Sequence, residues 1–400
     1  MSVKKHQYAA TASTVYFSYF MMGIGMSLLA QFKPQFASLW HSSISGVLSV
    51  VSAVGIGGIV SILITGPISD HFGRRASAVI GHLLWAIYYI GLLYAPNFAV
   101  AYIIGILGGI ANSFLNASNF PALMEIFPES ASVAGLMSKF AINIGQFCLP
   151  LAILLGTALG SGYRTVFMLA GILYIVMALI LAFSPYPDQV TGPKKQEKAK
   201  HDFNLGVWSL VLMGFTSTAA FLLWINTYQE LAKSYGIANP SSLQSVYAVG
   251  ASIAVLFNSF IIKKGVKEID KGVKEIDILI WYPLLSAAGL LLAYFINAPQ
   301  ILYLTSLAVG FFAASGLYQL GQSVLGQIYP DMKATVQSWG GFFSAFANFA
   351  IIQLAASITA RTGAAAPRLI LLLNVANMLV GTALAFVVKR VDQKKQGKAD

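Results

Sequence analysis

Long apolar runs alternate with short polar segments along the whole chain. The runs are about 20 residues long, which is the length that an α-helix needs to cross the hydrocarbon core of a bilayer. We expect six spans in the first half, at residues 9–30, 44–68, 76–94, 98–120, 132–157 and 164–184. We expect six more in the second half, at residues 205–229, 242–262, 278–296, 300–323, 334–358 and 367–388. The pattern predicts a polytopic all-α membrane protein with twelve transmembrane helices.

The composition agrees with this pattern and excludes an ordinary soluble domain. Hydrophobic residues make up 57% of the 400 residues and charged residues only 10%, whereas soluble domains contain about 25% charged residues. The net charge of +11 does not indicate a nucleic-acid partner, because the basic residues cluster between spans and in the tails. Residues 1–7 are polar, and the run after them is too long for the core of a signal peptide. The single Cys148 allows no intramolecular disulfide, and we interpret it as a packing residue.

The basic residues also predict an orientation and a division into domains. Most of them lie between spans on the side that holds both termini. Because cytoplasmic loops carry an excess of lysine and arginine, we expect a multi-pass protein of the cell membrane with both termini in the cytoplasm. Residues 185–204 have the composition of a solvated linker. This segment would join an N-terminal bundle at 1–184 to a C-terminal bundle at 205–400.

Two short motifs are repeated along the chain. The sequence IFPE at 126–129 follows span four, and IYPD at 328–331 follows span ten. Two similar halves are typical of transporters built from internal repeats, so we expect two pseudo-symmetric six-helix bundles. The heptapeptide KGVKEID occurs at 264–270 and again at 271–277. We interpret it as a tandem duplication in a cytosolic loop, where extra length costs little.

The loop between spans two and three resembles a known family signature. Residues 66–75 have the sequence GPISDHFGRR, which resembles the Gly-x-Leu-Ala-Asp-Arg-x-Gly-Arg-Lys loop of the major facilitator superfamily. Gly66, Asp70, Gly73 and Arg74 match that signature, whereas His71 departs from it. Residues 162–167, GYRTVF, are similar to the Gly-Trp-Arg-x-x-Phe motif at the start of the family's sixth helix.

The resemblance implies a transporter that works by alternating access and a conformational latch at this loop. The residues of the latch would be Gly66, Asp70, Gly73, Arg74 and Asp331. Glycines at both ends allow a sharp turn, and Asp70 is expected just before the third span, where a carboxylate caps free N–H groups. Arg74 would pair with Asp70 or with Asp331. The alternative is an ordinary charged turn between two spans.

No group of residues suggests an enzyme. The five His residues are scattered, and no His or Cys cluster has the spacing of a metal site. The acidic residues lie in loops or near span ends, whereas proton relays are usually built within the membrane. We therefore expect no catalytic residue, no metal and no cofactor, and proton coupling stays an open alternative.

Neutral polar residues inside the spans form the candidate substrate site. Amides in lipid need partners, so they should face the protein interior or a water-filled cavity. In the family that the chain resembles, helices 1, 4, 7 and 10 line the cavity. The predicted substrate-binding residues are Tyr16, Tyr19, Asn112, Asn116, Lys139, Asn143, Gln146, Trp224, Asn226, Gln319 and Gln322. Some of these amides could instead only join helices, at about 1 kcal/mol each, which is our interpretation of Asn374 and Asn377.

Lys139 is the one charge inside a predicted span that lies away from the first residues of the span. Counted from Ser132, it lies about 10 Å below the cytosolic end of its helix. It either snorkels toward that end or faces the cavity, where it would pair with a substrate carboxylate or with Glu125. Lys139, Asn143 and Gln146 follow spacings of four and three and therefore share one helix face.

We predict a monomeric secondary transporter in the lipid bilayer that moves a small polar organic solute. An amide-rich cavity with one cation suits a sugar-like solute or a hydroxylated carboxylate. An exporter of drug-like compounds is the first alternative, although the antiporter motif of the family's fifth helix is not kept, because Gln146 follows Gly145. A non-transporting membrane sensor and a lipid flippase are further alternatives.

Overall fold

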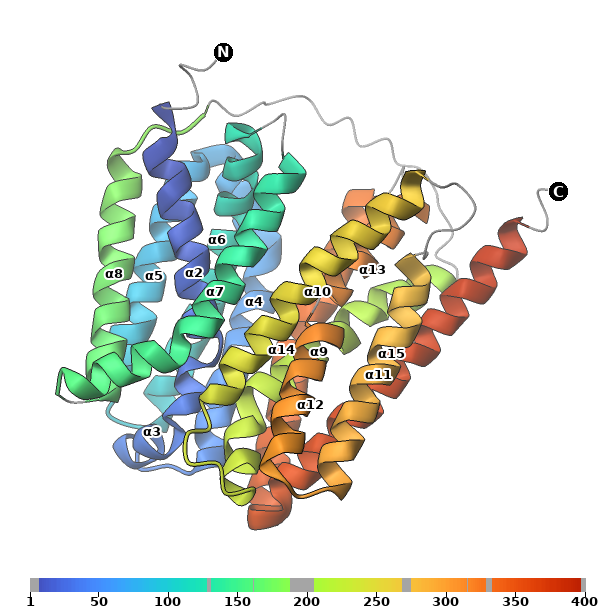
Figure 1. The fold of residues 1–400 in the computed structure, drawn as a ribbon. Helices are drawn as coiled ribbons and strands as arrows, with labels where there is room; N and C mark the ends of the chain where they lie inside the picture. The colour runs from blue at the N-terminus through green and yellow to red at the C-terminus, as the bar shows by residue number, and fades with distance from the viewer. Residues whose placement is uncertain are drawn as a thin grey trace. The chain divides into compact units, whose positions relative to one another are not determined.

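The computed structural model describes residues 7–127, 131–160, 162–187, 205–267, 275–314, 316–328 and 333–396. All regular secondary structure in these ranges is helical (Figure 1). The chain divides into two compact units, Met1–Lys194 and Lys195–Asp400. The division falls inside the segment that the sequence predicts to be a linker.

The first unit consists of long membrane-length helices and one short helix. The long helices are α2 (Ala9–Gln31), α4 (Ile44–Phe72), α5 (Arg74–Tyr94), α6 (Phe98–Ile126), α7 (Ala131–Ala158) and α8 (Tyr163–Phe183). Their ends lie within a few residues of the predicted spans. The short helix α3 (Lys33–Leu39) was not predicted, although Pro34 in its first turn is a favourable start signal.

The second unit repeats the succession of long helices with one interruption. Its helices are α9 (Leu205–Ser234), α10 (Ser242–Lys267), α11 (Glu275–Phe295), α12 (Pro299–Phe312), α13 (Leu317–Ile328), α14 (Lys333–Thr362), η3 (Gly363–Ala365) and α15 (Ala366–Gln396). The prediction of one continuous span at 300–323 is wrong, because the helix is divided into α12 and α13. Gly316 lies between them with φ 99°, a left-handed conformation that glycine adopts without a steric penalty.

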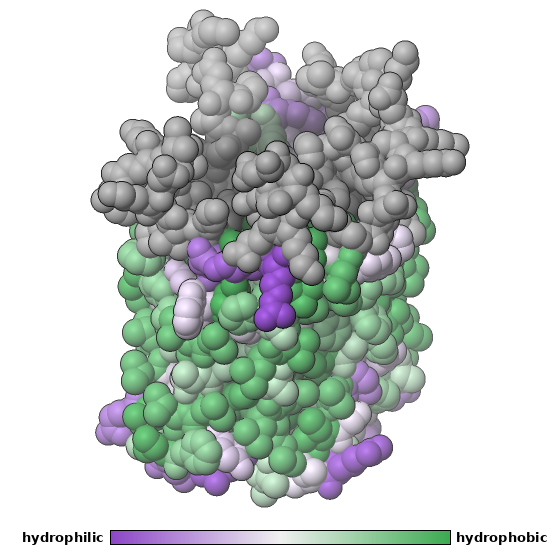
Figure 2. All heavy atoms as spheres, turned by 90° about the vertical axis from the view of Figure 1, so that its right-hand side faces the viewer, coloured by the Kyte–Doolittle hydropathy of each residue, from purple (hydrophilic) through white to green (hydrophobic). Residues whose placement is uncertain are grey.

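The apolar helices are consistent with the predicted twelve spans. Nine segments of the described chain are long and apolar enough to cross a membrane. One of them, Trp339–Val391, covers most of both α14 and α15. Two shorter apolar helices, Ser242–Asn258 and Pro299–Phe312, belong to α10 and α12. Hydrophobic residues cover most of the coloured part of the face shown in Figure 2, as expected where side chains meet lipid.

The loop at residues 66–75 differs from its prediction. Helix α4 continues to Phe72, so Gly66 lies within a helix instead of a turn. Asp70 lies in the last turn of α4 and not just before α5. The turn is made by Gly73 alone, whose φ of 94° is left-handed, and α5 begins at the next residue. The prediction of two turn glycines therefore holds for one of them.

Glycines bring helix pairs into close contact in both units. A Cβ on Gly145 of α7 would overlap the Phe20 carbonyl oxygen of α2, and a Cβ on Gly109 of α6 would overlap the Val54 carbonyl oxygen of α4. In the second unit, Gly214 of α9 lies against the Gly340 backbone of α14, and Gly310 of α12 lies against the Tyr247 carbonyl of α10. Small residues at helix crossings are the usual way to pack helices where lipid supplies no hydrophobic driving force.

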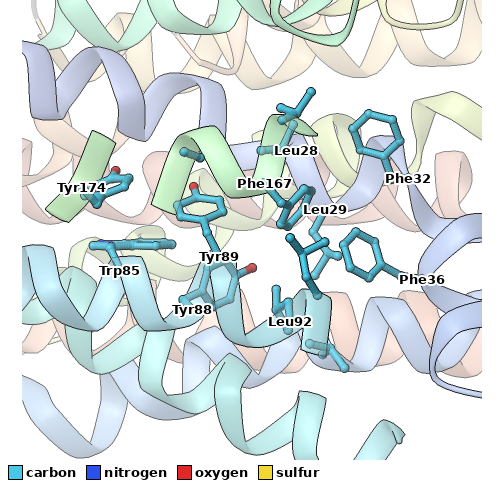
Figure 3. Close-up of a cluster of buried hydrophobic side chains, with 14 of the residues drawn as sticks. Leu28, Leu29, Phe32, Phe36, Trp85, Tyr88, Tyr89, Leu92, Phe167 and Tyr174 are labelled. Carbon is cyan, nitrogen blue, oxygen red and sulfur yellow. The ribbon is translucent and has the colours of Figure 1, made fainter. Parts of the chain in front are cut away.

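An aromatic cluster fills the interior of the first unit between α2, α5 and α8 (Figure 3). The rings of Trp85, Tyr89 and Tyr174 are mutually stacked, with centroids 5.5, 5.6 and 5.9 Å apart. Phe167 of α8 adds an edge contact to Tyr89 at 5.7 Å. Such pairs contribute about 0.5–1.5 kcal/mol each beyond the burial of their area. His82 lies at the edge of this cluster and is fully buried.

Candidate functional site

The predicted polar residues of the first unit lie on α2, α6 and α7, which contact one another. Tyr16 of α2 donates a 3.5 Å hydrogen bond to the Ala134 carbonyl of α7. Gln146 of α7 donates to the Met26 sulfur of α2 at 3.3 Å. The close α2–α7 crossing at Gly145 is what allows these side chains to reach the neighbouring helix.

The same residues differ in how much of each side chain is exposed. Tyr19, Asn143 and Gln146 are buried. Tyr16, Asn112 and Lys139 are half-buried, and Asn116 is exposed. The polar residues of the three helices therefore extend from the interior of the unit, at Asn143 and Gln146, to its exposed surface, at Asn116. Amide and hydroxyl groups of this kind donate and accept hydrogen bonds, and the ammonium of Lys139 adds a positive charge.

Asn119 is a polar residue of this region that was not among the predicted site residues. Its Nδ2 donates to the Ser18 hydroxyl at 3.3 Å, and both residues are buried. The bond joins α6 to α2. Asn119 continues the spacing of Asn112 and Asn116, so the sequence contained the signal, but only the structure assigns its partner.

Lys139 forms no ion pair with the described residues of the chain. The acid closest to it in sequence among them, Glu125, pairs with Arg74 at 3.4 Å. The sequence suggested that Glu125 could neutralise Lys139, but Arg74 competes for the same carboxylate. An ammonium within a membrane helix is costly without a counter-charge, so the half-buried Lys139 offers this surface a positive charge that can bind an anion.

Arg74 organises the end of the first unit where α4, α5 and α6 meet. Its guanidinium donates to the Ser69 hydroxyl at 2.9 Å and contacts Glu125 at 3.4 Å, and the Ser69 hydroxyl donates to the Ala117 carbonyl at 2.9 Å. Ser69 and Glu125 were not predicted to take part. The side chain of Asp70 and the whole of Asp331 lie outside the described residues, so the predicted latch stays a prediction.

The predicted residues of the second unit are placed in its interior as far as the structure describes them. Trp224 and Asn226 of α9 are 3% and 1% exposed. Asn226 donates to the Leu222 carbonyl of its own helix at 2.9 Å. The side chains of Gln319 and Gln322 lie outside the described residues.

Asn374 and Asn377 of α15 join two helices, as the sequence suggested. They donate 2.9 Å hydrogen bonds to the Ala220 and Thr216 carbonyls of α9. All four groups lie within the second unit. Within the described ranges, no three His, Cys, Asp or Glu residues form a group that could hold a metal ion.

Comparison with known proteins decides the family. Residues 15–273 match the sequence profile of the Major Facilitator Superfamily, which is well over half of the chain. The protein belongs to the Major Facilitator Superfamily. The family resemblance that the loop at residues 66–75 suggested is confirmed.

Two full-length relatives of this superfamily member come from Escherichia coli K12. The inner membrane transport protein YdiM is 29% identical, covering 90% of this chain and 89% of its own. The inner membrane transport protein YdiN is 30% identical, covering 84% of this chain and 80% of its own. The 4-hydroxybenzoate transporter PcaK of Pseudomonas aeruginosa is 25% identical over 54% of this chain and 54% of its own. The multidrug transporter MdfA of Edwardsiella piscicida is 29% identical over 34% of this chain and 36% of its own.

Solved structures show the superfamily fold. A crystal structure of a D-xylose–proton symporter aligns with a TM-score of 0.78 over 96% of this chain and 97% of its own, at 16% identity. The structural similarity confirms the predicted fold class, an all-α membrane fold. At this identity it carries no information about the substrate.

Proposed function

We propose that this superfamily transporter moves a small hydroxylated carboxylate across the cell membrane by alternating access. The observation that carries the proposal is Lys139, a half-buried cation within a membrane helix that forms no ion pair with the described residues. A substrate carboxylate would supply the missing counter-charge. The sequence predicted a small polar solute that is either sugar-like or a hydroxylated carboxylate, and the charge of Lys139 favours the carboxylate.

The neighbours of Lys139 support the same substrate class. Asn143 and Gln146 follow it at spacings of four and three, so the three side chains share one face of α7. Their amides can hydrogen-bond hydroxyl groups, while the ammonium binds the acid. The named substrate of the relative PcaK, 4-hydroxybenzoate, is itself a hydroxylated carboxylate. Trp224, Asn226, Gln319 and Gln322 stay predicted contacts from the second unit.

The names of two relatives and the basic residues of the chain support a location for this protein. The relatives YdiM and YdiN are named as inner membrane proteins, and we infer the same membrane for this chain. From the basic residues between spans we infer that both termini lie in the cytoplasm. Glu125 is paired with Arg74, so this acid does not argue for proton coupling. The uptake assay with and without a pH gradient tests the coupling.

A drug exporter is the second candidate. The partial similarity to MdfA favours it, and α7 exposes a row of apolar side chains at Phe140, Ile144, Phe147 and Leu151. These residues lie on the face of α7 opposite to Gly145, where contact with lipid accounts for them equally well. Export of lipophilic cations would not require Lys139, since like charges repel.

Uptake into proteoliposomes tests the proposal. Labelled hydroxylated carboxylates, sugars and a lipophilic cation are offered with and without a pH gradient. Lys139→Ala should lower carboxylate kcat/KM roughly 10- to 100-fold, as expected for the loss of a hydrogen bond to a charged group, and leave any neutral sugar unaffected. Lys139→Arg should retain most of the carboxylate uptake, because it retains the charge.

The matched control is Lys389→Ala, which removes a lysine paired with Asp277 at 2.7 Å in the second unit. It should leave substrate selection unchanged. If Lys139→Ala transports every carboxylate as well as the wild type does, the lysine only snorkels and the proposed substrate class is wrong. Transport of the lipophilic cation alone would favour the exporter.

A further inference from the structure

A small pocket in the second unit lies between α9, α11 and α15. It is lined on α9 by Trp224, Thr227 and Tyr228, on α11 by Leu290, and on α15 by Pro367 and Asn374. The pocket offers room for about one water molecule. Its walls are mainly apolar, so any polar group that faces it depends on a partner inside it.

Two polar atoms of the lining residues have no hydrogen-bond partner among the described residues. They are the indole Nε1 of Trp224 and the amide Oδ1 of Asn374. The two residues are only 3% and 2% exposed. An unsatisfied buried polar group costs about 1–3 kcal/mol, so a hydrogen-bond partner for these two atoms would stabilise the second unit.

The chemistry of the two atoms is complementary. An indole Nε1 can only donate a hydrogen bond. The orientation of the Asn374 amide follows from its other contact, because the Ala220 carbonyl accepts a 2.9 Å bond and must face the Nδ2. The free Asn374 atom is therefore the oxygen, which can only accept. Two residues that line one pocket thus contribute a donor and an acceptor, and neither atom has a partner among the described residues.

We propose that this pocket is a hydration site that holds one water molecule between Trp224 and Asn374. The water accepts a hydrogen bond from the Trp224 indole and donates one to the Asn374 amide oxygen. Its second hydrogen can reach the Thr227 hydroxyl, which donates its own hydrogen to the Leu223 carbonyl and can still accept. Three polar partners are what a buried water typically has.

The site gives Trp224 a role in addition to the predicted substrate contact. Its indole N–H is used inside the second unit, where the water joins α9 to α15 beside the direct bond from Asn374 to Ala220. Trp224 then helps to hold α9 in position against α15. This inference does not depend on the proposed substrate, because it concerns the interior of one unit.

Nuclear magnetic resonance on the full-length protein, labelled with nitrogen-15 tryptophan, tests the site. The chain has 6 tryptophans, and loss of one indole signal in Trp224→Phe assigns that of Trp224. We expect the Trp224 N–H to show cross-relaxation with a bound water. Trp40 is the internal control, because its buried Nε1 donates directly to the Leu92 carbonyl at 3.1 Å and should show no water contact.

Two variants test whether Asn374 shares the water. Asn374→Leu should abolish the water contact of Trp224 and shift its N–H signal. Asn377→Leu is the matched control, because Asn377 also bonds a carbonyl of α9 but does not line the pocket, and it should change neither property. The wild-type measurement decides the matter even if Asn374→Leu does not fold. A Trp224 N–H without water contact, or a water contact that survives Asn374→Leu unchanged, would overturn the proposal.

Discussion

The two units share one framework of helix contacts and fill it differently. In both, the first helix packs on the fifth and the second packs on the fourth through glycines, as Gly145 and Gly109 do in the first unit and Gly214 and Gly310 do in the second. The difference lies between the first and sixth helices. In the first unit, the rings of Trp85 and Tyr89 from α5 and of Tyr174 from α8 lie in the cluster that includes α2 (Figure 3), whereas in the second unit α9 and α15 are in much more extensive contact than α2 and α8 are.

The two units hold their helices together in different ways, by aromatic packing in the first unit and by amide hydrogen bonds in the second. Asn374 and Asn377 hold α15 to α9 by bonds to backbone carbonyls. Amide hydrogen bonds are short and directional, so they require the helices to be close. The aromatic rings of the first unit are large, and they fill the space between α2, α5 and α8 by packing against one another.

Removing one ring of the cluster should have the largest effect on this comparison. We expect Trp85→Ala to destabilise the protein by about 3–5 kcal/mol, because it leaves a cavity among stacked rings. The measurement is the thermal unfolding midpoint in detergent. Trp281→Ala, at a tryptophan of α11 that is 59% exposed, is the control and should change the midpoint little. Equal losses in the two variants would show that the cluster does not hold the first unit together.

Enlarging the crossing glycines should have an intermediate effect that is similar in the two units. Gly109→Val and Gly310→Val each force a side chain into a backbone carbonyl of the neighbouring helix, and we expect about 1–3 kcal/mol of destabilisation from each. Folded yield and the unfolding midpoint report it. Gly321→Ala, where a Cβ meets no atom within 4 Å, should be neutral or stabilising. A large effect in one unit only would contradict the shared framework.

The smallest effect is expected at the end of α4, where the proposed latch lies. An exposed ion pair contributes only about 0–1 kcal/mol, yet about 1.4 kcal/mol changes a two-state population tenfold. We expect Asp70→Asn to raise the inward-facing population and slow turnover while substrate affinity stays nearly unchanged. Cysteine accessibility from each side of the membrane measures the shift. If accessibility and turnover both match the wild type, the segment at residues 66–75 does not act as a latch.

Helix positions could be predicted from the sequence far better than helix interruptions. Apolar length located the spans, because each must cross the same bilayer. The break between α12 and α13 was missed, since small residues around Gly316 are as common inside membrane helices as at their ends. Asp70 was assigned to the start of α5 because it resembles a capping residue. The turn needed only Gly73, and α4 extends past Asp70.

The candidate site was predicted in part, and the limit has a simple cause. Spacing placed Lys139, Asn143 and Gln146 on one face of α7, since the period of a helix is local. Spacing could not show that Arg74 takes Glu125 as a partner, or that Asn119 bonds Ser18. Each of these bonds joins residues that are far apart in the sequence.

The pattern of apolar runs was enough to predict a helical membrane protein, and the motif at residues 66–75 was enough to suggest its superfamily. Hydrocarbon excludes unpaired backbone groups, so apolar runs of this length can only be helices. The tertiary structure alone decided which partner each buried polar side chain has. Any amide can bond any nearby carbonyl, and nearness is set by helix crossings such as that of α2 and α7 at Gly145. The pattern of residues specifies the helices, whereas their contacts specify the chemistry inside each unit.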